Sequence, residues 1–291
     1  MKKMSIFCFG FGQVAKNFIK KIKKEKINFE LNSTSRKETE EKIFENIKYK
    51  NFHFNEKQFD KGLINKLENA DHILISIAPI NGEDIILKDF KKNIENLKCK
   101  WITYLSATSV YGNHDGKWVD ENSSTNPTSP NGIERLKAEK AWIDISKKRN
   151  LPLQIFRLSG IYSNNYNILT RLQAGEAKIV NKKEHFFSRI HVEDIANILF
   201  KSLDNFKKGE IYNISDDRPA SNEEIILHGI KLLGLNKPKT IEFNDIESEM
   251  LKNFYKDSKK VSNKKMKKHF NYELKFSSFV EGLNYIRNHF I

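Results

Sequence analysis

The chain has 291 residues, of which 38% are hydrophobic, and a formal net charge of +14. This length and apolar content suffice for a sizeable core in one large or two unequal α/β domains, and they exclude a disordered chain. The longest apolar runs fall far short of the ~20 residues that a membrane span needs. The basic N-terminal residues are not followed by the cleavage site of a signal peptide. The two cysteines are expected to be buried free thiols. We therefore expect a cytoplasmic protein without membrane contact.

The positive charge is spread along the chain. Of the 51 basic residues, 43 are Lys and 8 are Arg. Neither zinc-finger spacing nor an aromatic RNA-binding strand accompanies the densest basic run, residues 256–268. We therefore expect a small-molecule substrate and no nucleic-acid partner.

The first twenty residues have the pattern of a strand, a glycine turn and a helix. The apolar run 6–9 precedes the turn, and apolar residues recur at helical spacing after it. In a dinucleotide-binding unit, Gly10 would make the tight turn, Gly12 would let the backbone approach a pyrophosphate, and the helix start would face the phosphate. We therefore assign cofactor binding to Gly10, Phe11, Gly12, Gln13 and Val14.

The second predicted strand, residues 27–31, indicates which cofactor is bound. Folds that prefer NAD place an Asp or Glu after this strand, on the ribose 2′-hydroxyl. Here the strand is followed by residues 32–37 without a carboxylate. The Ser35 hydroxyl and the Arg36 guanidinium suit a 2′-phosphate, so the sequence favours NADP, with NAD as the alternative.

Further strand-like runs alternate with amphipathic helical stretches up to about residue 160. They are residues 51–54, 71–77, 101–105 and 153–158. This alternation predicts an α/β fold with a Rossmann-type, doubly wound parallel sheet. Because ligands of such sheets lie beyond the carboxyl ends of the strands, Ala78 and Pro79 are candidate walls of the cofactor site.

Six segments follow one another in an order typical of a known superfamily. They are the glycine turn, LSATSVYG, PTSPNGIERLKAEKAW, IFRLSGIY, RIHVEDIA and IYNISDD, which cover residues 5 to about 215. The set resembles the short-chain dehydrogenase/reductase superfamily, on its extended, epimerase/dehydratase-like side. The resemblance implies a Rossmann domain over 1–162, to which 185–215 return, and a smaller C-terminal substrate-binding cap over 163–291. It also implies that the cofactor lies beside Ser106, Ser159, Gly160 and Ile161.

The resemblance also locates the usual catalytic positions, and all three are altered. Aligning residues 129–132 with the family's S-P-Y-G places Asn131 at the acid/base Tyr and Arg135 at the Lys, while Ala107 replaces the Ser or Thr. Asn131 does not titrate. Arg135 does not readily release a proton, although its N–H donors can hold a ribose hydroxyl or a phosphate. The chain thus resembles an atypical subgroup that keeps the dinucleotide site without the Tyr/Lys pair.

The loop after the fifth strand supplies another candidate acid/base. It is His114, because histidine is the side chain type that ordinarily changes charge near neutral pH, although the composition of residues 112–116 also fits a simple turn. Tyr111 and Arg189 are candidate substrate contacts, the latter because a cation beside the cleft could meet an anionic substrate. His191 is expected to brace a turn and Asp194 to begin a helix, so we expect no metal site.

These observations predict an NADP-binding oxidoreductase or epimerase/dehydratase that acts on a small sugar- or nucleotide-linked substrate. The alternative is an NAD(P)-binding sensor or scaffold without turnover, because the Tyr/Lys pair is absent. Analogy with relatives suggests a homodimer.

Overall fold

The structure is a computed structural model that describes residues 3–182 and 184–291. The chain divides into two compact units that interleave along the sequence. Unit 1 comprises Met1–Ser106, Glu134–Arg157 and Ile195–Tyr212, and unit 2 comprises Ala107–Ile133, Leu158–Asp194 and Asn213–Ile291. The sequence suggested a single boundary near residue 162 with one returning segment. The observed division is finer, because residues 107–133 already belong to unit 2 and residues 134–157 return to unit 1.

A nine-stranded sheet has the order β13-β9-β7-β6-β1-β2-β4-β3, with β5 paired to β4. Its strands are β1 (Met4–Phe9), β2 (Phe29–Ser35), β3 (Glu40–Phe44), β4 (Ile47–Asn55), β5 (Gln58–Phe59), β6 (His72–Ile75), β7 (Trp101–Ala107), β9 (Leu153–Leu158) and β13 (Ile211–Ile214). The pairs among β7, β6, β1, β2 and β4 are parallel. From β1 the chain order runs outward through β6, β7, β9 and β13 on one side and through β2 and β4 on the other, which confirms the predicted doubly wound α/β fold.

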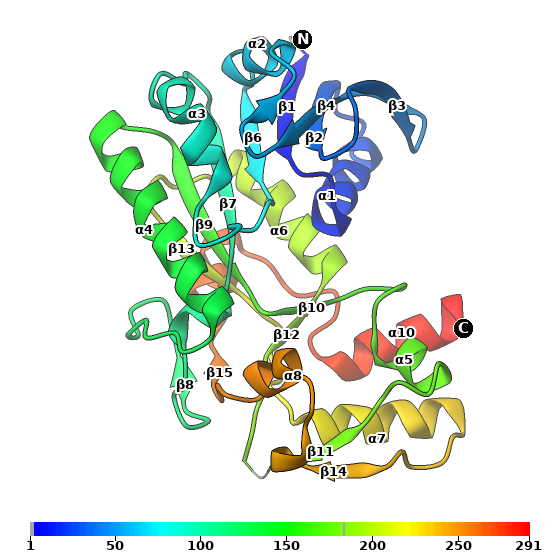
Figure 1. Ribbon diagram of the computed structural model, residues 1–291. Coiled ribbons are helices and arrows are strands. Elements are labelled where there is room, and N and C mark those ends of the chain that lie inside the picture. The colour runs from blue at the N-terminus through cyan, green and yellow to red at the C-terminus, as the bar shows by residue number, and fades with distance from the viewer. Residues whose placement is uncertain (1–2, 183) are drawn as a thin grey trace. The chain divides into compact units, whose positions relative to one another are not determined.

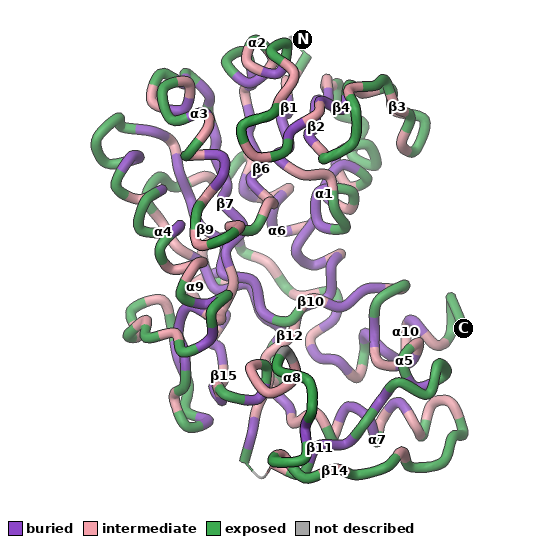
Figure 2. Tube along the Cα trace, in the orientation of Figure 1, coloured by how far each residue is buried: buried purple, intermediate pink, exposed green. Residues whose placement is uncertain are grey.

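Helices cover both faces of this sheet (Figure 1). One face carries α2 (Gly62–Glu68), α3 (Ile85–Glu95) and α4 (Pro130–Arg149), and the other carries α1 (Gln13–Lys24) and α6 (Val192–Asp204). On the second face, the Phe18 ring of α1 stacks on Trp101, 6.0 Å between centroids, and the indole N–H of Trp101 donates to Ser202 of α6. Because both faces are covered, β6 and β9 are buried at every residue (Figure 2).

The expected strand at residues 51–54 is part of a longer hairpin that the sequence pattern missed. β4 pairs antiparallel with β3, and Glu45 and Asn46 close the turn with positive φ angles of 51° and 60°. No helix separates β2 from β4, so the predicted strand-helix alternation is wrong at this edge. The side chains of β3 are exposed or half-buried, as is typical of a charged edge strand. They therefore form no strongly apolar pattern from which the hairpin could be predicted.

β2 also extends beyond the predicted residues 27–31, because its polar side chains find partners inside the sheet. The Ser33 hydroxyl donates to Asn51 Oδ1 at 3.0 Å, and Thr34 Oγ1 accepts from the backbone N–H of Gly10 at 3.0 Å. The strand therefore ends at Ser35, directly before Arg36.

Unit 2 contains short elements around a helical core. They are the 3₁₀ helices η1 (Thr108–Tyr111) and η2 (Phe243–Asp245), the strands β8 (Trp118–Val119), β10 (Gly160–Tyr162), β11 (Ile179–Asn181), β12 (Arg189–His191), β14 (Thr240–Glu242) and β15 (Lys260–Val261), and the helices α5 (Ile168–Gln173), α7 (Asn222–Leu233), α8 (Glu249–Phe254), α9 (Lys264–Phe270) and α10 (Phe279–Phe290). The Ser221 hydroxyl caps α7 by accepting from the N–H of Glu224, and Gly234 ends the helix in a left-handed conformation. Within the described ranges, no helix has the length and apolar character needed to cross a membrane.

Candidate functional site

The glycine turn is held by the strands on either side of β1. Gly10 has a φ of +82°, and a Cβ atom there would lie 2.8 Å from Ser76 Oγ. The N–H of Gly10 donates to Thr34 Oγ1. The Ser76 hydroxyl donates to the carbonyl oxygens of Phe9, at 2.9 Å, and Gly10, at 3.1 Å. Only glycine fits at position 10, as the sequence predicted.

The start of α1 has the features of an anion site. Gly12 is the N-cap residue, and no side chain of the described residues caps the helix. The first turn carries no acidic residue, and a Cβ built on Gly12 would meet nothing within 4 Å. Uncapped N–H groups and the positive end of the helix dipole therefore face open space. These residues fit the pyrophosphate of a dinucleotide.

Ser35 and Arg36 lie at the same edge of the sheet, at the carboxyl end of β2. Ser35 Oγ accepts from Asn51 Nδ2 at 2.8 Å and from the N–H of Lys37 at 3.2 Å, which orients the hydroxyl. Arg36 is exposed. A hydroxyl and an exposed guanidinium at this edge are chemically suited to a phosphate group.

The other unit 1 candidates follow neighbouring parallel strands. Ala78 and Pro79 come after β6, and Ser106 lies near the end of β7. The Ser106 hydroxyl is buried, and no described residue bonds to it, so it is a polar group suited to a ligand. Arg135 Nη1 donates to the carbonyl oxygen of Leu105 at 2.9 Å, which fixes the guanidinium near the end of β7. The structure thus brings these candidates to one edge of the sheet.

The unit 2 candidates are mostly engaged in holding that unit together. The Tyr111 hydroxyl is buried and donates to Asn213 Oδ1 at 2.7 Å. His114 Nε2 lies 3.2 Å from the carbonyl oxygens of both Tyr111 and Ser124. Arg189 Nη1 donates to the carbonyl oxygens of Phe187, at 3.0 Å, and Ala220, at 3.3 Å. Their catalytic and substrate roles stay predictions.

The remaining candidates of unit 2 differ in exposure. Asn131 is exposed in the first turn of α4, whereas Ser159 is buried with no described partner for its hydroxyl. Gly160 and Ile161 begin β10, which pairs with Arg189 and Ile190 of β12.

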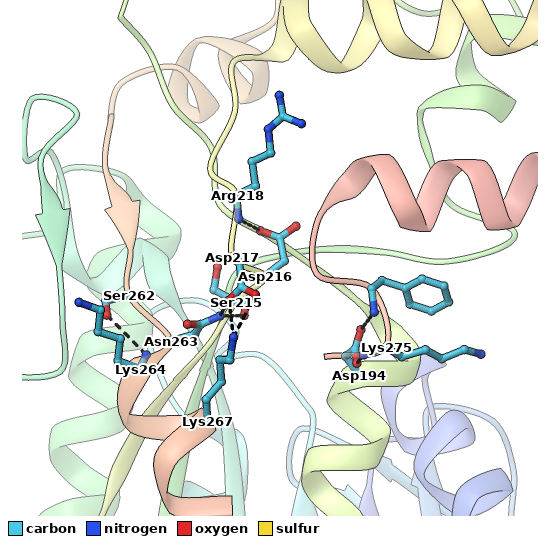
Figure 3. Close-up of polar contacts among 11 residues, drawn as sticks. Asp194, Ser215, Asp216, Asp217, Arg218, Ser262, Asn263, Lys264, Lys267 and Lys275 are labelled. Carbon is cyan, nitrogen blue, oxygen red and sulfur yellow. Dashed lines mark hydrogen bonds and ion pairs between the residues drawn. The ribbon is translucent and has the colours of Figure 1, made fainter. Parts of the chain in front are cut away.

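His191 and Asp194 act as structural braces, as expected. Burial lowers the pKa of His191 to about 4, and the neutral ring accepts from the N–H of Glu193 at Nδ1. Asp194, in the first turn of α6, accepts from the Tyr272 hydroxyl at 2.6 Å and from the N–H of Phe276. It also accepts from the N–H of Lys275 (Figure 3). No metal-ligating cluster of His, Cys, Asp or Glu occurs among the residues that the structure describes.

A buried carboxyl group follows β13, and no sequence pattern predicted it. Asp216 is 1% exposed, and its Oδ1 accepts from the N–H of Arg218 at 3.2 Å, whereas no described residue bonds to Oδ2. Burial raises its pKa well above the ordinary value. Its neighbour Asp217 instead pairs with Asn263 and Lys267 (Figure 3). Burial therefore disfavours the charged form of the Asp216 carboxyl group.

An Asp216→Asn variant should be more stable than the parent chain at pH 8, by about 1–2 kcal/mol, and the difference should shrink towards pH 4. The native pKa is raised, so the folded state binds more protons than the unfolded one. Stability is then greatest below the unfolded pKa and falls as the pH rises through the native pKa. Urea unfolding at both pH values measures this, with the exposed Asp144→Asn as control. Destabilisation at pH 8 would contradict the assignment.

A cavity of about 370 Å³ lies within unit 2. It is lined by Val180, Asn181, Lys182, Glu184, His185, Ser221, Asn222, Glu223 and Tyr255. His185 is 3% exposed, and neither ring nitrogen has a hydrogen bond of ordinary geometry with a described residue. Burial, followed by the charge of Lys182, lowers the pKa of His185 to about 4, so the ring is neutral. His185 was not predicted, because a single His in a loop forms no recognisable sequence pattern.

The fold and the glycine turn together define a Rossmann-type, NAD(P)-binding class of protein. The model of the NAD dependent epimerase/dehydratase family matches residues 86–215. Protein YeeZ of Escherichia coli K12 is 27% identical over 191 residues, which are 62% of this chain and 65% of YeeZ. The match thus spans less than two thirds of that relative.

Solved structures give a fuller match. A conserved protein of unknown function from Silicibacter pomeroyi is 28% identical, with a TM-score of 0.81 over 97% of this chain and 98% of that one. UDP-glucuronic acid 4-epimerase from Bacillus cereus, solved with NAD, has a TM-score of 0.76 at 16% identity, over 99% of this chain and 98% of the epimerase. That identity shows the fold alone. The family model thus supports the epimerase/dehydratase-like resemblance over residues 86–215, and the solved structures confirm the α/β fold over nearly the whole chain.

Proposed function

We propose that the chain is an NADP-binding, atypical extended short-chain dehydrogenase/reductase. It would act as an oxidoreductase or epimerase/dehydratase on a small sugar- or nucleotide-linked substrate. The observation that carries the proposal is the uncapped start of α1 at Gly12, which faces open space beside Ser35 and Arg36. When bound, a nicotinamide cofactor supplies hydride exchange, and the protein supplies position and electrostatics.

We assign a separate role to each group of residues in the site. The glycine turn would hold the pyrophosphate, and Arg36 would hold the 2′-phosphate. Arg135 and Ser106 would donate hydrogen bonds near the end of β7. Because Asn131 cannot relay a proton, the first candidate for acid/base work is His114, which would have to give up its bonds to the carbonyl oxygens of Tyr111 and Ser124.

We assign substrate recognition to the unit 2 cavity around His185. The side chains of Asn181, Ser221 and Asn222 and the neutral imidazole offer both donors and acceptors. Such a lining suits the hydroxyl groups of a sugar. We further propose a homodimer in solution that binds no nucleic acid, and light scattering of the purified chain tests its oligomeric state.

An Arg36→Ala variant should bind NADP about 10- to 100-fold more weakly than the parent chain, with little change for NAD. The substitution removes a charged hydrogen-bond donor to the 2′-phosphate, which only NADP carries. Such a hydrogen bond contributes roughly 1.5–3 kcal/mol to the binding free energy. Isothermal titration with both cofactors measures the two dissociation constants, and Arg149→Ala, an exposed arginine on α4, is the control. Equal or tighter binding of NAD by the parent chain would overturn the NADP assignment.

The second candidate function is a non-catalytic NAD(P) sensor or scaffold. It is favoured by the absence of the Tyr/Lys pair and by the internal hydrogen bonds of Tyr111 and His114. Purified protein is incubated with NADPH and a panel of carbonyl compounds and nucleotide sugars. A substrate-dependent change in absorbance at 340 nm, or an epimerised product seen by NMR, supports the enzyme. Tight cofactor binding with neither signal supports the sensor.

A further inference from the structure

Phe11, the residue between the two glycines of the turn, packs on the β3–β4 hairpin. Its ring lies 5.4 Å from that of Phe44, at 87°, and 5.0 Å from that of Tyr49, at 46°, between centroids. Phe44 is the last residue of β3, and Tyr49 lies in β4. Edge-to-face and tilted pairs at these distances are favourable beyond their buried area.

The hairpin is in turn tied to α1. Lys20 Nζ pairs with Glu45 at 2.9 Å, and Lys23 donates to the backbone carbonyl of Glu45. The ammonium groups of Lys16 and Lys20 lie 5.9 and 5.6 Å from the centre of the Phe44 ring. Each exposed contact is weak alone, but together they set the hairpin against the helix that starts at the glycine turn.

The two halves of the turn are held differently. The Gly10 half is bound by hydrogen bonds to Thr34 and Ser76. In the second half, the carbonyl oxygen of Gly12 accepts from the N–H of Lys16 at 2.9 Å, and the Phe11 ring supplies the contact of this half with the hairpin. Fixing one residue's backbone costs roughly 1–2 kcal/mol of conformational entropy. A turn that is already fixed leaves less of this cost to the binding step.

We propose that Phe11, Phe44 and Tyr49 form an aromatic clasp that positions Gly12 for the cofactor pyrophosphate. Phe44 is thus a positioning residue, and the β3–β4 hairpin belongs to the dinucleotide site although it touches no phosphate. The inference rests on the proposed binding of a dinucleotide at the glycine turn.

The test is a double-mutant cycle, with NADP and NAD affinities from isothermal titration. Phe44→Ala should weaken binding of the preferred cofactor about fivefold, since it removes one aromatic contact, whereas Phe44→Tyr should keep the affinity. Ile43→Ala is the matched control, because Ile43 is on the same strand and 69% exposed. If Phe44 acts through Phe11, Phe44→Ala should cause no further loss in a Phe11→Ala background.

Thermal unfolding checks that each variant is folded. The clasp is overturned if Phe44→Ala leaves the affinity unchanged, or if it weakens binding equally with and without Phe11. In both cases the parent chain still binds, and the proposed function stands. If the parent chain binds neither cofactor, both the proposed function and the clasp are overturned.

Discussion

A Gly12→Val variant should fold like the parent chain and bind NADP and NAD at least about 100-fold more weakly, a loss of roughly 3 kcal/mol. Gly12 has φ −81° and ψ −168°, which a β-branched residue adopts without strain. The side chain would enter space that is open in the protein and that the pyrophosphate needs. Isothermal titration measures the affinity, and thermal unfolding measures the stability.

Gly10→Ala is the matched contrast. Its positive φ and the 2.8 Å approach to Ser76 Oγ predict a loss of about 1–3 kcal/mol in the free energy of unfolding. We thus expect Gly12 to be required for ligand binding and Gly10 for the fold. Normal cofactor binding by Gly12→Val would show that the pyrophosphate does not lie at the start of α1.

A Glu139→Gln variant should lose about 3–5 kcal/mol in the free energy of unfolding. Glu139 of α4 is 1% exposed and Arg157 of β9 is 4% exposed. Arg157 donates from Nε and Nη2 to the two carboxylate oxygens, with a shortest distance of 2.8 Å. Removing the carboxylate leaves a buried guanidinium without its counter-charge. Urea unfolding followed by circular dichroism measures the change.

A surface pair provides the control. Arg149 Nη2 lies 2.8 Å from Glu95 Oε2, but its side chain is 53% exposed, so Glu95→Gln should cost at most about 1 kcal/mol. Replacing both members of the buried pair, as Glu139→Leu with Arg157→Met, should cost less than Glu139→Gln alone. A loss below 1 kcal/mol for Glu139→Gln would contradict the importance of the buried pair.

Much of the dinucleotide half could be predicted from short stretches of sequence. The strand, turn and helix around Gly10 and Gly12 follow from residues that are neighbours in the chain, and the positive φ of Gly10 is a property of glycine itself. The end of β2 was misplaced because Ser33 and Thr34 look like loop residues. They are strand residues because Asn51 and Gly10 satisfy their hydrogen bonds.

The sequence by itself determined the class of fold and the position of the glycine turn, and through the resemblance it predicts that Asn131 and Arg135 replace the usual Tyr/Lys pair. Only the tertiary structure decided what the other side chains do. Tyr111 is hydrogen-bonded to Asn213, 102 residues away in the sequence, and Arg157 is hydrogen-bonded to Glu139, 18 residues away. The Phe11 ring packs on the β3–β4 hairpin, which no helical or strand periodicity predicted. Local propensity depends on neighbours in the chain, whereas burial and hydrogen-bond partners depend on which distant segments the fold brings together.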